Sequence, residues 1–175
     1  MIEKIKKQIL ESVTVKENMA EACVADMEAV AIIMISCIKN GGKILWCGNG
    51  GSAGDAQHLS TELMGGMTSH DRKPIPSIAL TTDTSFLTAW ANDTDFESIF
   101  SRQVQGLGCE GDVLVGISTS GNSENVIAAV KQAKYKELKT IVFTGKSGGR
   151  MPGLADVTIH VPSEDTQRIQ EGHIM

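Results

Sequence analysis

The sequence predicts an α/β fold, a three-layer αβα sandwich whose five-stranded parallel sheet lies between two layers of helices behind an N-terminal helical arm. Short runs that are apolar throughout alternate along the chain with segments of helical periodicity. Strands that are apolar on both faces are typical of a parallel sheet covered by helices on both sides. The length of 175 residues suits one domain, and no repeat or linker interrupts it. We therefore expect a single domain over 1–175, with the arm at 1–40 and the α/β core at 41–175.

The arm is expected from apolar residues at helical spacing over 2–13 and 15–40. The second of these helices should stop at Asn40-Gly41-Gly42, because glycine and asparagine favour the left-handed conformation that ends a helix. The elements that follow are expected to be strands at 43–47, 77–81, 113–117, 140–143 and 157–161, and helices at 52–64, 84–91, 95–106, 123–137 and around Gln170.

Composition excludes several classes of protein. A formal charge of −5 without any basic run gives no electrostatic reason to bind nucleic acid or an anionic membrane. The longest apolar stretch, Val30 to Ile38, is too short to span a bilayer, and the charged N-terminus is not a signal peptide. Cys23, Cys37 and Cys47 lie in apolar runs, and Cys109 forms no metal-binding spacing with them, so we expect free thiols and a cytoplasmic protein.

The first candidate site is the glycine loop, Gly48–Gly54, between an expected strand and an expected helix. Its glycines let backbone amides approach an anion closely, and a helix N-terminus favours negative charge. It is no Walker loop, because no lysine follows, and Asp83 comes too late to be the acidic residue of a dinucleotide fold. The alternative is a tight turn in which Ser52 caps the helix.

The second candidate site is the hydroxyl loop, Ser118–Ser123, which also joins an expected strand to an expected helix. Its four hydroxyl side chains and one glycine suit a phosphate held by neutral donors. The alternative is ordinary capping, although capping requires only one hydroxyl. Since ligands of parallel sheets bind beyond the carboxyl ends of the strands, two such loops indicate an anionic, polyhydroxylated ligand.

His58 and Glu62 lie four residues apart and so share a face of the helix that follows the glycine loop. Such a pair can bind one divalent metal or supply an acid and a base, and the alternative is a solvated pair. His173, Trp46 and Trp90 are expected to be core or interface residues. No pattern supports a role for either His70 or His160.

Several segments together resemble the sugar isomerase (SIS) domain family, and in particular its heptose phosphate isomerases: GNGGSAGDAQHLSTEL, SIALTTDTSFLTAWAND, FSRQV, GDVLVGISTSGNSENVIAAV and RIQEGH. The resemblance implies a Rossmann-like or flavodoxin-like SIS fold. It implies conversion of sedoheptulose 7-phosphate to D-glycero-D-manno-heptose 7-phosphate through an enediolate, the first step toward nucleotide-activated heptose for surface polysaccharides such as lipopolysaccharide. It also implies a bound zinc ion (Zn2+) and a homotetramer with active sites between subunits.

The same resemblance assigns residues by matching motif. It implies Glu62 as the catalytic base and zinc ligands at His58, Glu62 and Gln170. It implies a phosphate cradled by the side chains of the hydroxyl loop. The implied substrate-binding residues are Asn49, Gly50, Gly51, Ser52, Asn92, Asp93, Ser118, Thr119, Ser120, Ser123 and Gln170.

This sequence departs from the family pattern in three places. Relatives carry a second histidine ligand about two helical turns after Gln170, whereas this sequence stops first, so we expect a shortened C-terminal helix and a requirement for further residues. Gly66 stands where many relatives have an arginine near the substrate, a role that Arg72 is expected to take. Gly172 lies inside the last helix, where glycine costs about 1 kcal/mol, so we expect fraying that weakens the position of Gln170.

Three other functions stay open. The family also contains a non-enzymatic adaptor that binds the bacterial replication initiator protein and lacks a glutamate at the position of Glu62. A sugar-phosphate-sensing regulator is a second alternative, although no helix-turn-helix precedes the domain. An isomerase of pentose or hexulose phosphates is the third, because the two loops do not measure sugar length.

Overall fold

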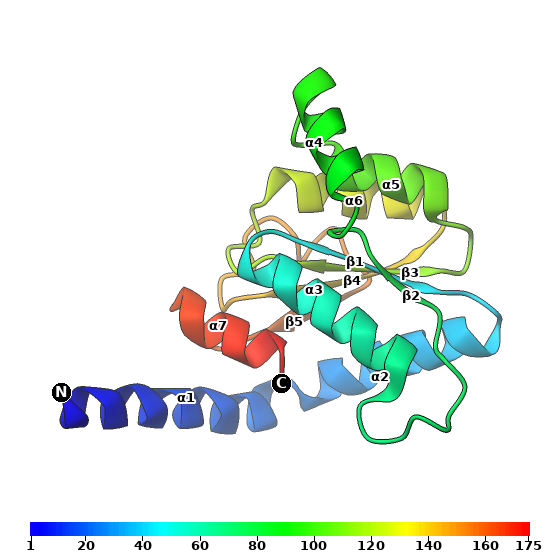
Figure 1. Ribbon diagram of the computed structural model, residues 1–175. Helices are drawn as coiled ribbons and strands as arrows, with labels where there is room; N and C mark the ends of the chain where they lie inside the picture. Colours follow the sequence, from blue (N-terminus) through cyan, green and yellow to red (C-terminus); the bar gives the residue numbers. More distant parts are fainter.

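A computed structural model describes residues 1–175 as a twisted parallel sheet enclosed by helices (Figure 1). All five strands run parallel in the order β2-β1-β3-β4-β5, which confirms the expected sandwich. The strands are β1 (Ile44–Gly48), β2 (Ser77–Ala79), β3 (Val113–Ile117), β4 (Lys139–Thr144) and β5 (Val157–His160). The helices are α1 (Ile2–Ala22), α2 (Val24–Lys39), α3 (Gly51–Thr61) with its π-helical extension η1 (Glu62–Gly66), α4 (Thr84–Asp93), α5 (Ile99–Leu107), α6 (Glu124–Tyr135) and α7 (Thr166–His173).

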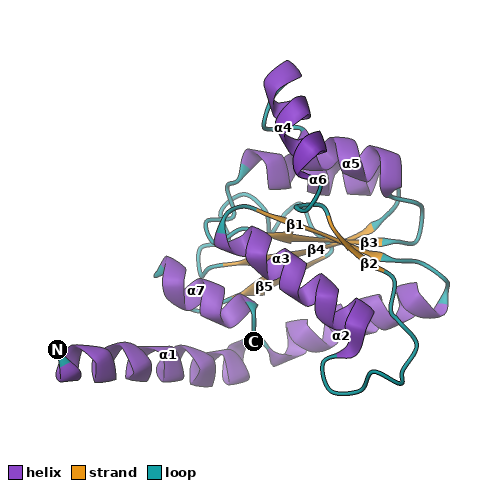
Figure 2. Cartoon of the chain, in the orientation of Figure 1, coloured by secondary structure: helices purple, strands orange, loops and turns teal.

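The two faces of the sheet bury two separate apolar clusters. Successive residues of a strand point to opposite faces, so Ile44 and Trp46 of β1 join one cluster while Leu45 and Cys47 join the other. The first cluster is covered by α2, α3 and α7, and the second by α5 and α6 (Figure 2). Every residue of β1 and β3 is buried, which explains why these strands are apolar throughout.

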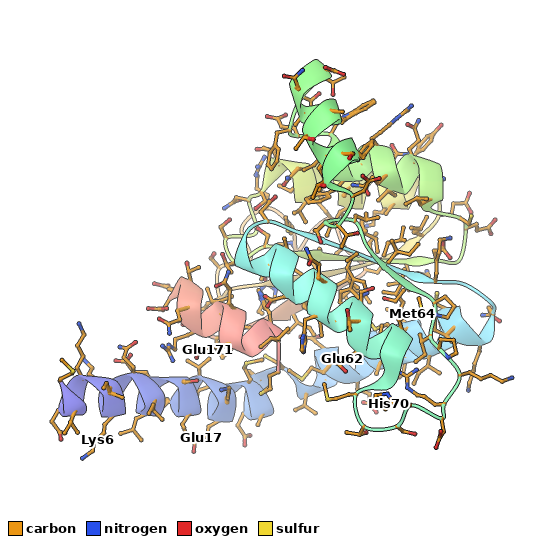
Figure 3. The ribbon with its side chains drawn as sticks, in the orientation of Figure 1. Lys6, Glu17, Glu62, Met64, His70 and Glu171 are labelled. Carbon is orange, nitrogen blue, oxygen red and sulfur yellow. The ribbon has the colours of Figure 1, made fainter.

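The arm is divided at Cys23, so the expected break near residue 14 is wrong. The hydroxyl of Thr14 donates to the carbonyl of Leu10 inside an uninterrupted α1, and threonine is tolerated there. The Cys23 thiol instead donates to the carbonyl of His160 and anchors the junction of α1 and α2 beside β5. The N-terminal part of α1 extends beyond the body, and Lys6 and Glu17 mark its course in Figure 3.

Helix α7 is capped at its N-terminus and packed against its neighbours at Gly172, which gives that glycine a packing role. The Asp165 carboxylate caps its N-terminus by accepting the backbone N–H groups of Gln167 and Arg168. Gly172 is buried, and a Cβ there would lie 2.9 Å from both the Met19 sulfur and the Val161 side chain. The glycine therefore permits a close helix crossing, and it does not loosen the helix that carries Gln170.

Cys23, Cys37 and Cys47 are buried free thiols, as expected, and Cys109 is exposed and also free. Burial raises the pKa of Cys47 to about 12, so this thiol is neutral and unreactive. None of the helices combines the length and the apolar character that a bilayer crossing requires.

Candidate active site

The glycine loop and the hydroxyl loop meet at the carboxyl edge of the sheet. Strands β1 and β3 are hydrogen-bonded neighbours, and Gly48 pairs with Ile117 at their ends. Beyond these ends, the Asn49 amide donates to Asn125 Oδ1 at 2.8 Å and accepts from Asn125 Nδ2 at 2.9 Å. The two loops therefore lie side by side, and a pair of side-chain amides joins them.

The shape of the glycine loop follows from its close neighbours. Gly50 has a φ of +56° and precedes the first residue of α3, whereas Ser52 is buried inside the helix, so Ser52 is not the cap. A Cβ at Gly48 would lie 2.7 Å from the Ser52 carbonyl oxygen. A Cβ at Gly51 would overlap the side-chain amide of Gln170, which brings α7 to the start of α3.

The hydroxyl loop does not use its side chains to cap α6. Ser123 precedes this helix but makes no capping hydrogen bond, and its hydroxyl pairs with that of Ser118 at 2.9 Å. Thr119 and Ser120 line a cavity of about 220 Å³, together with Lys146. The capping alternative is thus wrong for Ser123. Thr119 and Ser120 share one cavity with the exposed side chains of Lys146 and Glu164.

His58 and Glu62 face each other at the end of α3, with 3.9 Å between His58 Nε2 and Glu62 Oε1. Figure 3 shows Glu62 on the side of α3 that faces α2. At Glu62 the helix widens into the π-helical turn η1, a feature that is frequent at functional sites. This turn ends at Gly66, whose φ is +84°.

Arg72 holds this turn in place through the backbone. Its guanidinium donates to the carbonyl oxygens of Glu62 at 2.6 Å and Leu63 at 2.7 Å. A Cβ at Gly66 would lie 3.2 Å from Arg72 Nε. Arg72 therefore caps the turn that carries Glu62, and the expected role of replacing a substrate-contacting arginine does not match these contacts.

An apolar cavity of about 320 Å³ lies between α2, α3 and α7, with Glu62 in its wall. His173 lines the same cavity and is 6% exposed, as expected for a core histidine. Its Nε2 lies 3.2 Å from the carbonyl oxygen of Thr144, while Nδ1 has no hydrogen-bond partner. Burial lowers the pKa of His173 to about 4, so the ring is neutral at pH 7.

Asn125 and Lys146 were not expected at this site, and Arg72 was expected to contact substrate rather than the backbone of η1. Asn125 lies 76 residues from its partner Asn49, Arg72 follows in a loop, and Lys146 follows the next strand of the sheet. Asn125 lies in the segment GDVLVGISTSGNSENVIAAV that carries the family resemblance. Its position in the first turn of the helix after the hydroxyl loop could have indicated a role at the site. Lys146 and the backbone contacts of Arg72 had no signal in the sequence, because only tertiary contacts create them.

Comparison with known proteins decides the family. The SIS domain family matches residues 7–145. The chain belongs to the SIS domain family. It is 52% identical over 174 residues to the phosphoheptose isomerase of Aquifex aeolicus, covering 99% of this chain and 91% of that protein. It is 51% identical over 175 residues to the phosphoheptose isomerase of a Nitratiruptor species, covering 100% and 93%.

Solved structures of this SIS family agree. The phosphoheptose isomerase of Neisseria gonorrhoeae is 46% identical with a TM-score of 0.92, over 98% of this chain and 91% of that one. The phosphoheptose isomerase of Francisella tularensis is 40% identical with a TM-score of 0.95, over 99% and 92%. These relatives confirm the SIS fold and the expectation of an isomerase.

For the zinc ion expected from the resemblance to heptose phosphate isomerases, the residues present offer part of a site. His58 and Glu62 are close enough to bind one ion, but no third His, Cys, Asp or Glu side chain joins them. Gln170 lies against Gly51, seven residues before His58 and so ~10 Å away along the axis of α3. The residues present therefore supply two zinc donors, His58 and Glu62, and Gln170 lies near the other end of the same helix, α3.

Asn92 and Asp93 lie away from the glycine loop and the hydroxyl loop of the same chain. Both are exposed on α4, which stands out from the body in Figure 1, and the Asn92 amide donates to its neighbour Asp93 at 2.8 Å. No hydrogen bond joins either side chain to the glycine loop or to the hydroxyl loop. Within one chain, Asn92 and Asp93 are therefore not part of the site that the two loops form.

Proposed function

We propose that the protein converts sedoheptulose 7-phosphate to D-glycero-D-manno-heptose 7-phosphate through an enediolate. The observation that carries the proposal is the junction of the glycine loop and the hydroxyl loop beside the helix that ends in Glu62. The phosphoheptose isomerases at about half identity over nearly the whole chain support the choice of a heptose phosphate.

In this proposal the phosphate binds in the cavity beside the hydroxyl loop. Thr119 and Ser120 supply hydroxyl donors, and Lys146 adds a positive charge to the cavity wall. Ser118 and Ser123 support the loop through their mutual hydrogen bond. The phosphate thereby fixes one end of the sugar, and the reacting end extends toward α3.

The chemical step moves a proton between adjacent carbons. Glu62 removes a proton from C1 of the ketose, and the electron pair forms the enediolate between C1 and C2. A proton then passes from the C1 hydroxyl to the C2 oxygen, and a proton returned to carbon C2 gives the aldose. In this proposal the amides of Asn49 and Gln170, beside the N-terminus of α3, supply neutral donors to the oxygens of the sugar. Arg72 fixes the backbone from which Glu62 extends.

We also propose that zinc binds to His58 and Glu62, which is supported by their spacing. Gln170 would become a further donor only if its amide moved ~10 Å along α3 from its place beside Gly51. When bound, zinc would polarise the substrate's carbonyl group. Glu62 cannot be a fully effective base while it binds a metal, so the effect of zinc on turnover shows which of the two roles Glu62 has. Metal content and turnover should be measured for the wild type and His58→Ala, with added zinc and with a chelator.

A homotetramer with active sites between subunits forms part of the proposal. It is supported by the apolar residues that α1 leaves exposed, among them Ile2, Ile5 and Ile9, and by the position of Asn92 and Asp93 on a projecting helix. Mixing inactive Glu62→Gln subunits with inactive Asn92→Ala subunits should restore turnover if one site takes residues from two chains. Absence of complementation would place both residues in the same chain's site.

We further propose that this reaction takes place in the cytoplasm and supplies heptose for surface polysaccharide. The buried free thiols support a reducing compartment. Deletion of the gene should deplete nucleotide-activated heptose and truncate the polysaccharide, and an unchanged heptose pool would contradict the assignment.

The experiment that tests the function is turnover of sedoheptulose 7-phosphate, followed by the appearance of the aldose. The wild type should be active and Glu62→Gln should lose ~10²- to 10⁴-fold in kcat. Pentulose and hexulose phosphates are the controls for sugar length, and comparable turnover of either would support the alternative isomerases. Binding of the sugar phosphate without turnover would support the adaptor, and binding to the replication initiator protein would then identify it.

A further inference from the structure

The two side-chain amides that join the loops form a reciprocal pair. Asn49 Nδ2 donates to Asn125 Oδ1 at 2.8 Å, and Asn125 Nδ2 donates to Asn49 Oδ1 at 2.9 Å. Asn125 is 3% exposed, in the first turn of α6, while Asn49 is half-buried in the glycine loop. The only hydrogen bonds of the Asn125 side chain are thus those to Asn49.

The pair also sets the orientation of the Asn49 amide. A carboxamide has two donor hydrogens and two acceptor lone pairs, so each partner keeps one N–H and one lone pair after the pair forms. Because Asn125 donates to the oxygen of Asn49 and accepts from its nitrogen, a flipped Asn49 would lose both bonds. The pair therefore holds the Asn49 carboxamide in place at the junction of the two loops and leaves it one N–H and one lone pair for a ligand.

We propose that Asn125 is a positioning residue for the isomerase: it acts through Asn49, holding the Asn49 amide toward the reacting end of the sugar and fixing the glycine loop against the hydroxyl loop. The inference rests on the proposed function for its substrate. Asn125 itself does not reach the sugar, because its amide is buried behind Asn49.

The pair explains why both positions are asparagine. Aspartate at position 125 would accept from Asn49 Nδ2, but it has no hydrogen to donate to Asn49 Oδ1 and would face that oxygen with a second acceptor. Leucine would leave both polar groups of Asn49 without a partner, at a cost in folding stability. The near-isosteric change Asn125→Asp therefore breaks the orientation with the smallest change in packing.

A double-mutant cycle tests the proposal, with Asn49→Ala, Asn125→Ala and the double variant. Misplacement of a binding group by about 1 Å can cost on the order of 100-fold in rate, so each single variant should lose ~10- to 100-fold in kcat. If Asn125 acts through Asn49, the double variant should be no slower than Asn49→Ala alone. Losses that multiply in the double variant would overturn the proposal.

The Asn125→Asp variant supplies a readout that a purely structural role would not change. Its kcat should fall while the inhibition constant for inorganic phosphate changes less than ~3-fold, because the hydroxyl loop keeps its own hydroxyl pair. Partial recovery is expected toward acid pH, where the new carboxyl group is protonated and can donate to Asn49 Oδ1. Equal loss of phosphate binding and of kcat at every pH would contradict the positioning role.

Thr140→Val is the matched control. The Thr140 hydroxyl donates to the Asp156 carboxylate at 2.8 Å and accepts from its backbone N–H at 3.1 Å, a reciprocal pair at the amino end of β4. This change should lower stability without changing kcat. If the wild type itself fails to isomerise the sugar phosphate, the proposed function fails, and the same cycle is then read from the affinity for sedoheptulose 7-phosphate by calorimetry. Additive affinity losses would overturn the positioning role separately.

Discussion

The glycine loop and the hydroxyl loop follow neighbouring strands of one sheet, yet different interactions determine their shapes. In the glycine loop, missing side chains make room: at Gly51 a Cβ would overlap the amide of Gln170. In the hydroxyl loop, side chains determine the shape, since Ser118 and Ser123 bind each other and Thr119 and Ser120 face a cavity. The first loop is thus built by close backbone approach and the second by hydroxyl donors. Substitutions in the glycine loop should therefore lower kcat, and substitutions in the hydroxyl loop should weaken the affinity for the substrate.

Among substitutions in the two loops, the largest effect is expected from Gly51→Ala. The new methyl group would displace the flexible end of Gln170, so the protein should fold normally while kcat falls ~100-fold. Gly54→Ala is the matched control in the same helix, because nothing lies within 4 Å of a Cβ there. It should leave kcat unchanged and stabilise the protein by about 0.5 to 1 kcal/mol. Equal kinetics for the two variants would show that the contact with Gln170 does not matter.

The next prediction concerns the pH dependence of folding stability, through His173 of α7, the helix that carries Gln170 to the glycine loop. The pKa of His173 is lowered by burial from 6.5 to about 4, so the unfolded chain binds this proton more tightly than the folded one. Stability is therefore complete above pH 6.5 and is lost as the pH falls toward 4, by about 2 kcal/mol at pH 5. Urea unfolding at pH 7 and pH 5 measures this loss.

His173→Leu should remove this part of the pH dependence, whatever its effect on stability at pH 7. A wild type and a variant that lose the same stability between pH 7 and pH 5 would contradict the assignment to His173.

In the hydroxyl loop, Ser120→Ala should raise KM ~10-fold with little change in kcat, because one hydrogen bond to a charged phosphate contributes about 1.5 kcal/mol. Ser101→Ala, whose hydroxyl donates to the carbonyl of Ser98 on α5, is the control and should change neither constant. A fall in kcat at unchanged KM would move Ser120 from phosphate binding to the chemical step.

The smallest effect is expected from Lys146→Met. Lys146 is exposed in the cavity beside Thr119, so solvent and salt screen its attraction for phosphate. KM should rise ~3-fold at low ionic strength, and the difference from the wild type should disappear in high salt. A salt-independent change would point to packing as the cause.

The sequence predicted the sheet and the two loops because their signals are local. Buried strands such as Val113–Ile117 are apolar throughout, and glycine or hydroxyl clusters follow two of them directly. The break between α1 and α2 was misplaced, since Cys23 acquires its role from a contact with His160. The π-helical turn at Glu62 depends on Arg72, and no periodicity reveals this contact between a side chain and the backbone.

The same reasoning explains the glycine in α7. Helix propensity alone predicts that Gly172 weakens the helix. In the folded protein the position has no space for a Cβ beside Met19 and Val161, so packing outweighs propensity. Local preference predicted the elements, and contacts between distant segments determined how the site is assembled.

The most direct test of the account is isomerisation of sedoheptulose 7-phosphate in deuterated water, with the product analysed at C2 by NMR. If Glu62 removes the C1 proton and an enediolate forms, deuterium from the solvent should appear at C2 of the aldose. The Glu62→Gln variant should lose turnover and exchange together. Turnover and exchange that persist undiminished in the variant would contradict Glu62 as the base of this site.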